Sequence, residues 1–304
     1  MAAIGILDGN WIMRSIGYYP GCSLGGTAAE YDRSLRALAA HVGVTLQEVP
    51  DWVCCGATSA HALDHDAALC LSADNLAKAR RAGLDQVLAP CAMCYQRLAV
   101  ASHEMKEHPG LARRLAAALG EAQDLPIGDV RPLSLLNWLE SWPDDRFRDL
   151  AKSPLKGLKV ACYYGCLLVR PPKVTGAADA ETPRSMERVV QLLGAQPVRW
   201  SMALECCGGS FAISRKSVVL RQGRIIYESA RRAGADVICL ACPMCHANLD
   251  MRQGEFGVPA EARLPVVYLT QLMNRAFGLS EESLGFEGHF IPVEPVLSAA
   301  ASRA

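Results

Sequence analysis

The sequence contains one stretch twice, about half a chain apart. Residues 79–94 read ARRAGLDQVLAPCAMC, and residues 230–245 read ARRAGADVICLACPMC. A second motif is also repeated, because VCCGATS at 53–59 has its counterpart in ECCGGS at 205–210. A duplication of this length within 304 residues predicts two structural units of the same fold.

Ten of the 13 cysteines follow this duplication as two matched sets of five. Each set has a single cysteine, then an adjacent pair, then a CxxC motif, and the single cysteines lie in GYYPGCS and YYGC. The second set follows the first at offsets of 144, 152, 152, 151 and 151 positions. The first set is Cys22, Cys54, Cys55, Cys91 and Cys94, and the second is Cys166, Cys206, Cys207, Cys242 and Cys245.

Short apolar runs typical of buried strands alternate with helical patterns in both halves. The patterns predict helices over 28–42 and 66–82 in the first half, and over 184–193 and 216–232 in the second. Each half is therefore expected to be a Rossmann-like β-α-β-α-β unit of an α/β protein, with a parallel sheet. The cysteine loops follow strand ends, so the five thiols of each set should meet at one edge of their sheet.

A different kind of segment separates the two units. It contains two amphipathic helical stretches, EHPGLARRLAAALGEAQD and LSLLNWLESWPDDRF. These either pack between the domains or, through Trp138 and Trp142, dock a partner subunit. The predicted organisation is a first domain at 16–105, a helical connector at 106–157, a second domain at 158–285 and a C-terminal tail at 286–304.

Charge and hydropathy limit the classes of partner and compartment. Lys+Arg and Asp+Glu both number 31, which does not favour a binder of nucleic acid or anionic membranes. The N-terminus lacks a basic n-region and no run of 18 apolar residues occurs, so we expect a cytoplasmic protein without a membrane span. In a reducing cytosol, an odd number of cysteines argues against a disulfide framework.

Five converging thiolates suit an iron–sulfur cluster better than a single small ion. A tetrahedral zinc site takes four ligands, and two adjacent cysteines reach one centre more easily if that centre is extended. A lone CxxC would instead favour a thioredoxin-like redox pair or a zinc ligand pair. Helix N-termini after the CxxC motifs would add N–H donors. The other cysteines, Cys70, Cys162 and Cys239, are interpreted as packing residues.

With these motifs in place, each half resembles the cysteine-rich CCG domain, whose pattern is C-x(31–39)-CC-x(35–36)-C-x-x-C. The intervals here are 31 and 35 residues in the first half, and 39 and 34 in the second, one short of the pattern. Two such domains in one chain resemble the disulfide-handling B-type component of heterodisulfide reductase, from about Ile16 to Leu284. This resemblance includes two further segments, YYGCLLVRP and LPVVYLTQLMNRAFGLSEESLG.

The resemblance implies an oxidoreductase subunit with two noncubane [4Fe-4S] clusters, one for each cysteine set. In the family the clusters face each other, and a disulfide is made or broken by two one-electron steps. It further implies a ferredoxin-like C subunit and a flavin-bearing A subunit as partners, and in bacterial sulfur oxidation a lipoate-bearing carrier protein. No other catalytic residue is implied. His246, next to Cys245, is expected to line the substrate cavity or to donate to a cluster sulfur.

Three alternatives remain open from the sequence. The chain could be a non-catalytic electron-transfer subunit of a flavin-dependent dehydrogenase of the succinate, glycolate, lactate or glycerol-3-phosphate type. It could be a zinc-stabilised scaffold, with zinc at one site. It could also be a metal-free thiol oxidoreductase that uses its CxxC pairs.

Overall fold

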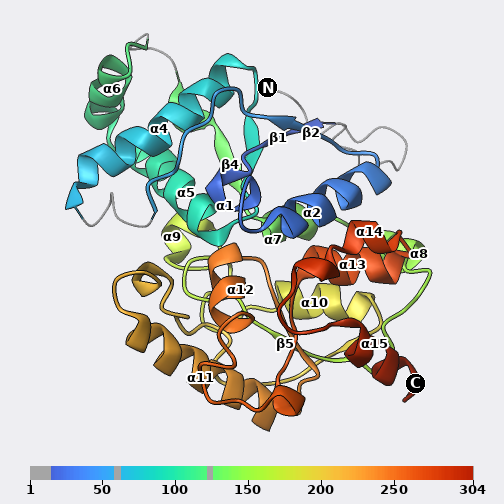
Figure 1. Cartoon of the computed structure of the whole chain (residues 1–304). Coiled ribbons are helices and arrows are strands. Elements are labelled where there is room, and N and C mark those ends of the chain that lie inside the picture. The colour runs from blue at the N-terminus through green and yellow to red at the C-terminus, as the bar shows by residue number, and fades with distance from the viewer. Residues whose placement is uncertain (1–14, 58–62, 122–125, 304) are drawn as a thin grey trace.

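The structure, a computed structural model, describes residues 15–57, 63–121 and 126–303. Two halves lie against each other, and each contains a four-stranded parallel sheet surrounded by helices (Figure 1). The strand order is β2-β1-β3-β4 in the first sheet and β6-β5-β7-β8 in the second. The two sheets therefore have the same topology, and the predicted duplicated α/β fold is confirmed.

The first half follows the predicted alternation of strands and helices. The helices expected over 28–42 and 66–82 are α2, Ala29–His41, and α4, His65–Arg81. The other elements are β1 (Ser15–Tyr18), α1 (Gly21–Leu24), β2 (Thr45–Glu48), β3 (Gln86–Leu88), α5 (Ala92–Glu107), α6 (Pro109–Ala118), the 3-10 helix η1 (Ile127–Asp129), β4 (Arg131–Leu133), α7 (Leu135–Glu140) and α8 (Asp144–Leu150).

The second half repeats this order. The helices expected over 184–193 and 216–232 are α10, Ser185–Leu192, and α11, Lys216–Arg232, and each ends shortly before a glycine with positive φ, at Gly194 and Gly234. The other elements are β5 (Lys159–Cys162), α9 (Pro172–Thr175), β6 (Gln196–Pro197), η2 (Gly209–Phe211), β7 (Val237–Leu240), α12 (Pro243–Leu249), η3 (Ala260–Ala262), β8 (Val266–Tyr268), α13 (Leu269–Phe277), α14 (Glu281–Leu284), η4 (Phe286–Gly288) and α15 (Glu294–Ala301).

The segment between the halves contains a strand as well as helices. Strand β4 pairs in parallel with β3 and becomes the fourth strand of the first sheet, which the helical pattern did not predict. Trp138 and Trp142 are 1 % and 3 % exposed and pack edge to face. Arg188 of α10 donates to the Trp142 carbonyl at 2.7 Å. The two tryptophans therefore pack inside the protein, and the idea that they dock a partner is wrong.

Helix α2 of the first half packs against α13 of the second. The rings of Tyr31 and Tyr268 stack with centroids 4.1 Å apart and planes 6° apart. Beside them, the hydroxyls of Ser34 and Thr270 lie 2.7 Å apart, and Asn274 Nδ2 donates to the Ser34 carbonyl at 2.8 Å. All five residues are buried. The hydrophobic core is therefore continuous across both halves and fixes how the two sheets face each other.

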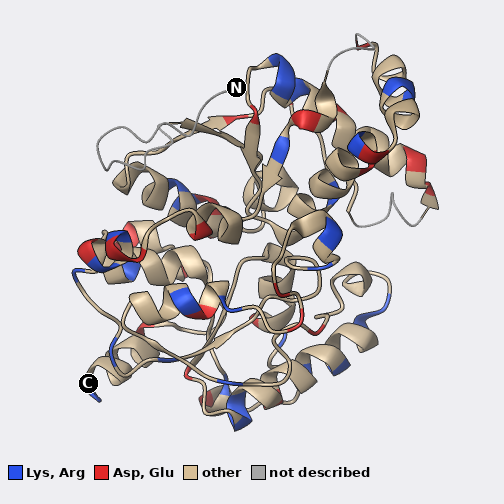
Figure 2. Ribbon diagram, turned by 180° about the vertical axis from the view of Figure 1, so that it is seen from behind, with Lys and Arg blue, Asp and Glu red and all other residues tan. Residues whose placement is uncertain are grey.

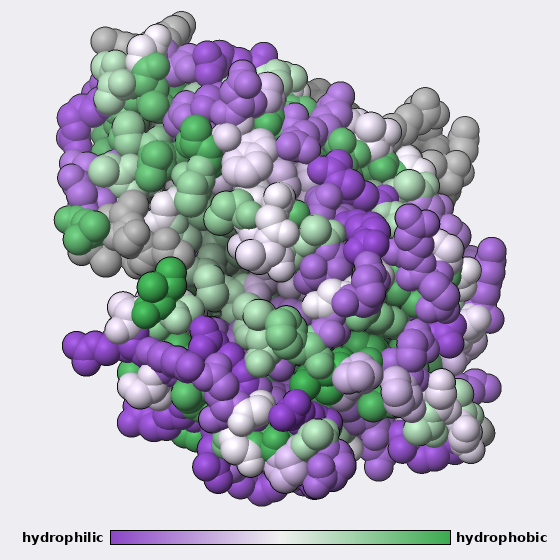
Figure 3. Space-filling view, viewed as in Figure 1, coloured by the Kyte–Doolittle hydropathy of each residue, from purple (hydrophilic) through white to green (hydrophobic). Residues whose placement is uncertain are grey.

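The surface carries mixed charges. In Figure 2, Lys and Arg alternate with Asp and Glu over the outer helices, and neither sign collects on one face. Figure 3 shows apolar residues gathered along the boundary between the halves on the face drawn there. Within the described ranges, no helix is both long and apolar enough to span a membrane.

Candidate functional site

The first cysteine set assembles at the carboxyl edge of the first sheet. Cys22 lies in α1 after β1, the Cys54-Cys55 pair follows β2, and Cys91 and Cys94 open α5 after β3. The sulfurs of Cys55 and Cys94 are 3.5 Å apart. This distance is a hydrogen bond between thiols rather than a disulfide bond of about 2.05 Å. The predicted convergence of loops from three strands is therefore present, with free thiols.

The second set has the same arrangement on the second sheet. Cys166 follows β5, and Cys242 is the N-cap of α12 after β7. The sulfurs of Cys207 and Cys245 lie 3.4 Å apart, matching the contact between their counterparts in the first half. The Gly208 N–H donates to the Cys206 sulfur at 3.3 Å.

A tyrosine in each half joins the single-cysteine loop to the loop with the adjacent pair. The Tyr19 hydroxyl donates to the Val53 carbonyl at 2.7 Å, and the Tyr163 hydroxyl donates to the Glu205 carbonyl at 2.5 Å. Val53 and Glu205 both directly precede a CC pair. Sequence reasoning did not single out these tyrosines, although the match of GYYPGC with YYGC held the signal.

Each set has an open side and a closed side. In the first set Cys22 and Cys54 are exposed, and in the second Cys206 is exposed and Cys166 is partly exposed. The other six thiols are buried: Cys55, Cys91, Cys94, Cys207, Cys242 and Cys245. A group bound by either set would thus be held from within and would face solvent at its outer rim.

Hydrogen bonds within the sets favour thiolates at specific sulfurs. Those from the thiols of Cys54 and Cys94 lower the pKa of Cys55 to about 3. A hydrogen bond from Cys166 lowers the pKa of Cys206 to about 6. Thiolate is the form that ligates metal, so both sets have the chemistry of a ligand site.

The two sets meet inside the molecule. Hydrogen bonds from the thiols of Cys245 and Cys91 lower the pKa of Cys242 well below its usual value, and backbone N–H groups of Cys245 and Met244 add to this. The last two donors belong to the first turn of α12, as predicted for the helices after the CxxC motifs. Because Cys91 and Cys242 belong to different halves, this interaction brings the inner ends of the two cysteine sets near each other.

The halves differ three residues after each CxxC. In the second half Asn248 Nδ2 lies 3.4 Å from the Cys207 carbonyl oxygen and 3.6 Å from its sulfur. In the first half the equivalent residue is Arg97, whose half-buried guanidinium interacts electrostatically with Cys55. Burial lowers the pKa of Arg97. The first set therefore has a cation nearby at the position where the second has a neutral amide.

The remaining cysteines occupy packing positions. Cys162 and Cys239 lie in the adjacent strands β5 and β7 with no exposed surface, and Cys70 lies on α4. His246 is buried as well, with its Nε2 atom 3.0 Å from the Val266 carbonyl oxygen and 3.2 Å from His289 Nδ1. The proposed hydrogen bond from His246 to a cluster sulfur stays a prediction.

The loop that carries Cys166 should make stability depend on pH through Glu187. The Tyr164 hydroxyl donates to this carboxylate, and burial raises the pKa of Glu187 above 4.5. The folded state then holds the proton more tightly than the unfolded state. This contribution to stability is complete below about pH 4.5 and is lost as the pH rises through the raised pKa.

Denaturant unfolding between pH 4 and 8 tests this dependence. The free energy of unfolding should decline less with rising pH for Glu187→Gln than for the wild type. Exposed Glu261→Gln is the control, and equal slopes for all three proteins would contradict the expectation.

Comparison with known proteins agrees with this geometry. The family model of the cysteine-rich domain called CCG matches residues 16–99 and 160–250. The membrane anchor subunit of 8-methylmenaquinol:fumarate reductase from Wolinella succinogenes is 32 % identical over 92 % of this chain and 98 % of its own length. The B-type component of the ferredoxin/F420H2-dependent CoB-CoM heterodisulfide reductase from Methanosarcina acetivorans is 27 % identical over 92 % and 94 %.

A more distant relative and one solved structure show the same architecture. A protein from Archaeoglobus profundus that is named as similar to this same B-type component is 23 % identical over 90 % of this chain and 93 % of its own. The crystal structure of a hypothetical protein from Helicobacter pylori superposes with a TM-score of 0.72 at 12 % identity, covering 93 % of this chain. This chain spans only 53 % of that protein, so the likeness shows the fold alone. The chain belongs to the family of oxidoreductase subunits built from two cysteine-rich CCG domains.

Proposed function

We propose that the chain is the iron–sulfur subunit of a heterodisulfide-reductase-like complex that makes or breaks a disulfide at two paired centres. Each cysteine set would hold one [4Fe-4S] cluster of the noncubane type, and the pair would supply two one-electron steps. The proposed ligands are Cys22, Cys54, Cys55, Cys91 and Cys94 for one cluster, and Cys166, Cys206, Cys207, Cys242 and Cys245 for the other.

The interaction between Cys91 of one half and Cys242 of the other carries this proposal. Reduction of a disulfide breaks one S–S bond, consumes two electrons and two protons, and yields two thiols. Two equivalent centres whose inner ligands interact with each other are suited to a substrate with two equivalent sulfurs. A chain that only relays electrons one at a time does not need such symmetry.

The fit of a cluster is supported by the close approach of the backbone and by the donors around each set. A side chain at Gly21 would place its Cβ 2.9 Å from the Cys94 sulfur, so the backbone approaches the thiols closely there. Backbone N–H groups reach the sulfurs of Cys206 and Cys242. Such N–H donors stabilise anionic sulfur, which every thiolate-bound cluster presents.

The residues on the open rim would admit the substrate and the partners. Cys22 and Cys54 on one half and Cys206 on the other are exposed, so a disulfide can reach both centres from outside. Electrons would pass through a ferredoxin-like C subunit and a flavin-bearing A subunit. In sulfur oxidation the substrate would be the thiols of a lipoate-bearing carrier protein.

A second function is favoured by one specific comparison. The relative from Wolinella succinogenes, at 32 % identity, belongs to a fumarate reductase rather than to a disulfide reductase. On that model the chain passes electrons between a flavin-bearing dehydrogenase and another acceptor and binds no thiol substrate. The same two clusters would then serve as relay centres only.

The proposal can be tested on anaerobically purified protein. The test measures iron and acid-labile sulfide per chain and records EPR spectra before and after a thiol is added. We expect about eight irons and about eight sulfides, with a cluster signal that changes when the thiol is added. Full iron content with a thiol-insensitive signal would favour the electron-relay function. A colourless chain that contains zinc and no sulfide would overturn both iron–sulfur functions. A colourless chain without metal would also overturn them and would favour a thiol oxidoreductase that uses its CxxC pairs.

Two matched glycine variants should separate backbone strain from crowding of a sulfur. Gly21 and Gly165 both have φ of 65°, and a new Cβ would lie 2.9 Å from Cys94 Sγ in the first case and 3.5 Å from Cys245 Sγ in the second. Both alanine variants should lose about 1–2 kcal/mol of stability to the left-handed backbone. Only Gly21→Ala should also reduce iron per chain, because it must displace a proposed ligand. Equal iron content in the two variants would contradict this expectation.

A further inference from the structure

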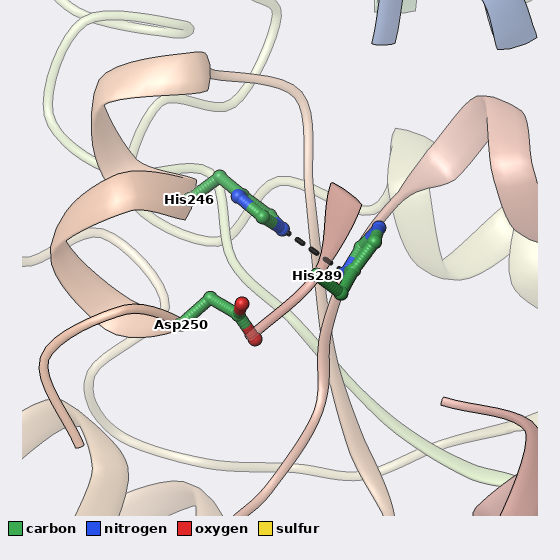
Figure 4. Close-up of side chains that lie close together, drawn as sticks. All are labelled: His246, Asp250 and His289. Carbon is green, nitrogen blue, oxygen red and sulfur yellow. Dashed lines mark hydrogen bonds between the residues drawn. The ribbon is translucent and has the colours of Figure 1, made fainter. Parts of the chain in front are cut away.

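We propose that His246, Asp250 and His289 form a binding site for one divalent metal ion of the zinc class, separate from both cysteine sets. Figure 4 shows His246 and Asp250 projecting from one side and His289 facing them from the other. One ligand atom from each of the three residues lies within 4.8 Å of the others. Two imidazoles and a carboxylate are ligands that zinc takes readily in proteins.

Two distances at this site match the spacing of neighbouring ligands around a zinc ion. His246 Nε2 lies 3.2 Å from His289 Nδ1 and 3.0 Å from the Val266 carbonyl oxygen. Zinc–ligand bonds of about 2.0–2.1 Å place neighbouring tetrahedral ligands about 3.3 Å apart. His246 Nε2 is therefore spaced from His289 Nδ1 and from the Val266 carbonyl oxygen as neighbouring ligands of one ion would be. The Asp250 carboxylate, within 4.8 Å of the imidazole nitrogens, would be the remaining ligand.

A second observation points independently to a cation. Asp250 has no exposed surface, and its Oδ1 atom has no hydrogen-bond partner among the described residues. The other carboxylate oxygen accepts the Phe290 N–H at 2.7 Å, which fixes the side chain. A buried carboxylate oxygen without a donor is costly unless the group is protonated or a cation approaches it.

One hydrogen bond opposes metal binding. Gln271 Nε2 lies 2.8 Å from His289 Nε2 and 2.7 Å from the Leu284 carbonyl, while its Oε1 atom accepts the Tyr268 N–H. This fixed amide donates to His289 Nε2, so the ring proton sits on Nδ1 without metal. A metal at Nδ1 would move that proton and break this contact. The loss is one hydrogen bond, which is small beside the binding free energy of a structural zinc site.

The ion would connect two distant parts of the chain. Asp250 lies one helical turn after His246, as the hydrogen bond from Asp250 N to His246 O shows, and His246 directly follows Cys245. His289 follows η4, in the C-terminal segment. The ion would hold this segment against the helix that opens with the second CxxC. Because His246 is only 4 % exposed and Asp250 is fully buried, the role is structural rather than catalytic.

The test measures zinc, iron and sulfide per chain on the full-length, anaerobically purified protein and on three variants. We expect about one zinc in addition to the iron in the wild type. His289→Gln and Asp250→Asn should lose that zinc and keep their iron. His108→Gln is the matched control, because its side chain is 64 % exposed on the other half. Loss of zinc in the control, or retention in both site variants, would overturn the proposal.

Added Co²⁺ provides a readout that does not depend on the variants folding. In the difference spectrum with and without added Co²⁺, binding at this site should give weak visible d–d bands and no new thiolate-to-metal charge transfer, because its ligands are nitrogen and oxygen. Strong charge transfer would place the metal on the cysteines instead. A fully iron-loaded wild type that contains no zinc and retains neither added Zn²⁺ nor Co²⁺ would also overturn the proposal.

Discussion

Replacing Cys242 with alanine is expected to remove about half of the iron and sulfide from the anaerobically purified chain, from about eight of each to about four. Cys242 is buried, receives hydrogen bonds from Cys245 and Cys91, and caps α12. Its loss removes an inner ligand that no exposed residue can replace. The first set keeps all five of its thiols, so its cluster should survive and remain visible by EPR.

The controls for this variant come from the same chain. Cys239 lies three residues earlier on β7 with no exposed surface, and Cys70 lies on α4. Cys239→Ala and Cys70→Ala should both keep about eight irons, although the first should lose some stability to a small cavity. If Cys242→Ala retained all its iron, or if Cys239→Ala lost half, the assignment of the second ligand set would be wrong.

The second large effect is expected at the boundary between the halves. Tyr31→Ala should lower the free energy of unfolding by about 3–5 kcal/mol, because it removes a fully buried ring from the core. That ring stacks on Tyr268 of the other half, and its hydroxyl donates to the Pro90 carbonyl next to Cys91. Tyr31→Phe keeps the stack and removes only this hydrogen bond, so its cost should be about 1 kcal/mol.

Denaturant unfolding of the two variants measures these stabilities. A second measurement, the magnetic coupling between the two clusters seen by EPR, addresses function. The Tyr31–Tyr268 stack interacts electrostatically with the thiols of both Cys91 and Cys242. Any magnetic coupling between the two clusters should weaken in Tyr31→Ala and persist in Tyr31→Phe. Similar stability losses in both variants would show that the stack does not hold the halves together.

The local elements followed from the sequence because their signals are local. The helix predicted over 216–232 is α11, with identical bounds, and the helix at 184–193 differs from α10 by one residue at each end. Their apolar residues recur at helical spacing, and a glycine ends each pattern. Strand β4 was missed because a three-residue run, Arg-Pro-Leu, has no period of its own and owes its pairing to the neighbouring β3.

The candidate site also has features that the sequence predicts and features that only the structure shows. The duplication, the ten matched cysteines and the strand-end position of every cysteine loop could all be read from spacing. The tyrosine hydrogen bonds at Val53 and Glu205, and the pairing of Asn248 with Cys207, required coordinates. Each joins residues more than thirty positions apart, and a single sequence carries no record of such contacts.

By itself, the sequence determined that this protein has two α/β units, each with five thiols at the edge of a parallel sheet. Only the tertiary structure decided that the two edges meet at Cys91 and Cys242, that Trp138 and Trp142 are buried, and that His289 faces His246 across forty-three positions. The reason is physical. Strand order and helix bounds depend on short-range periodicity, whereas the orientation of the two halves depends on how α2 and α13 bury their side chains against each other.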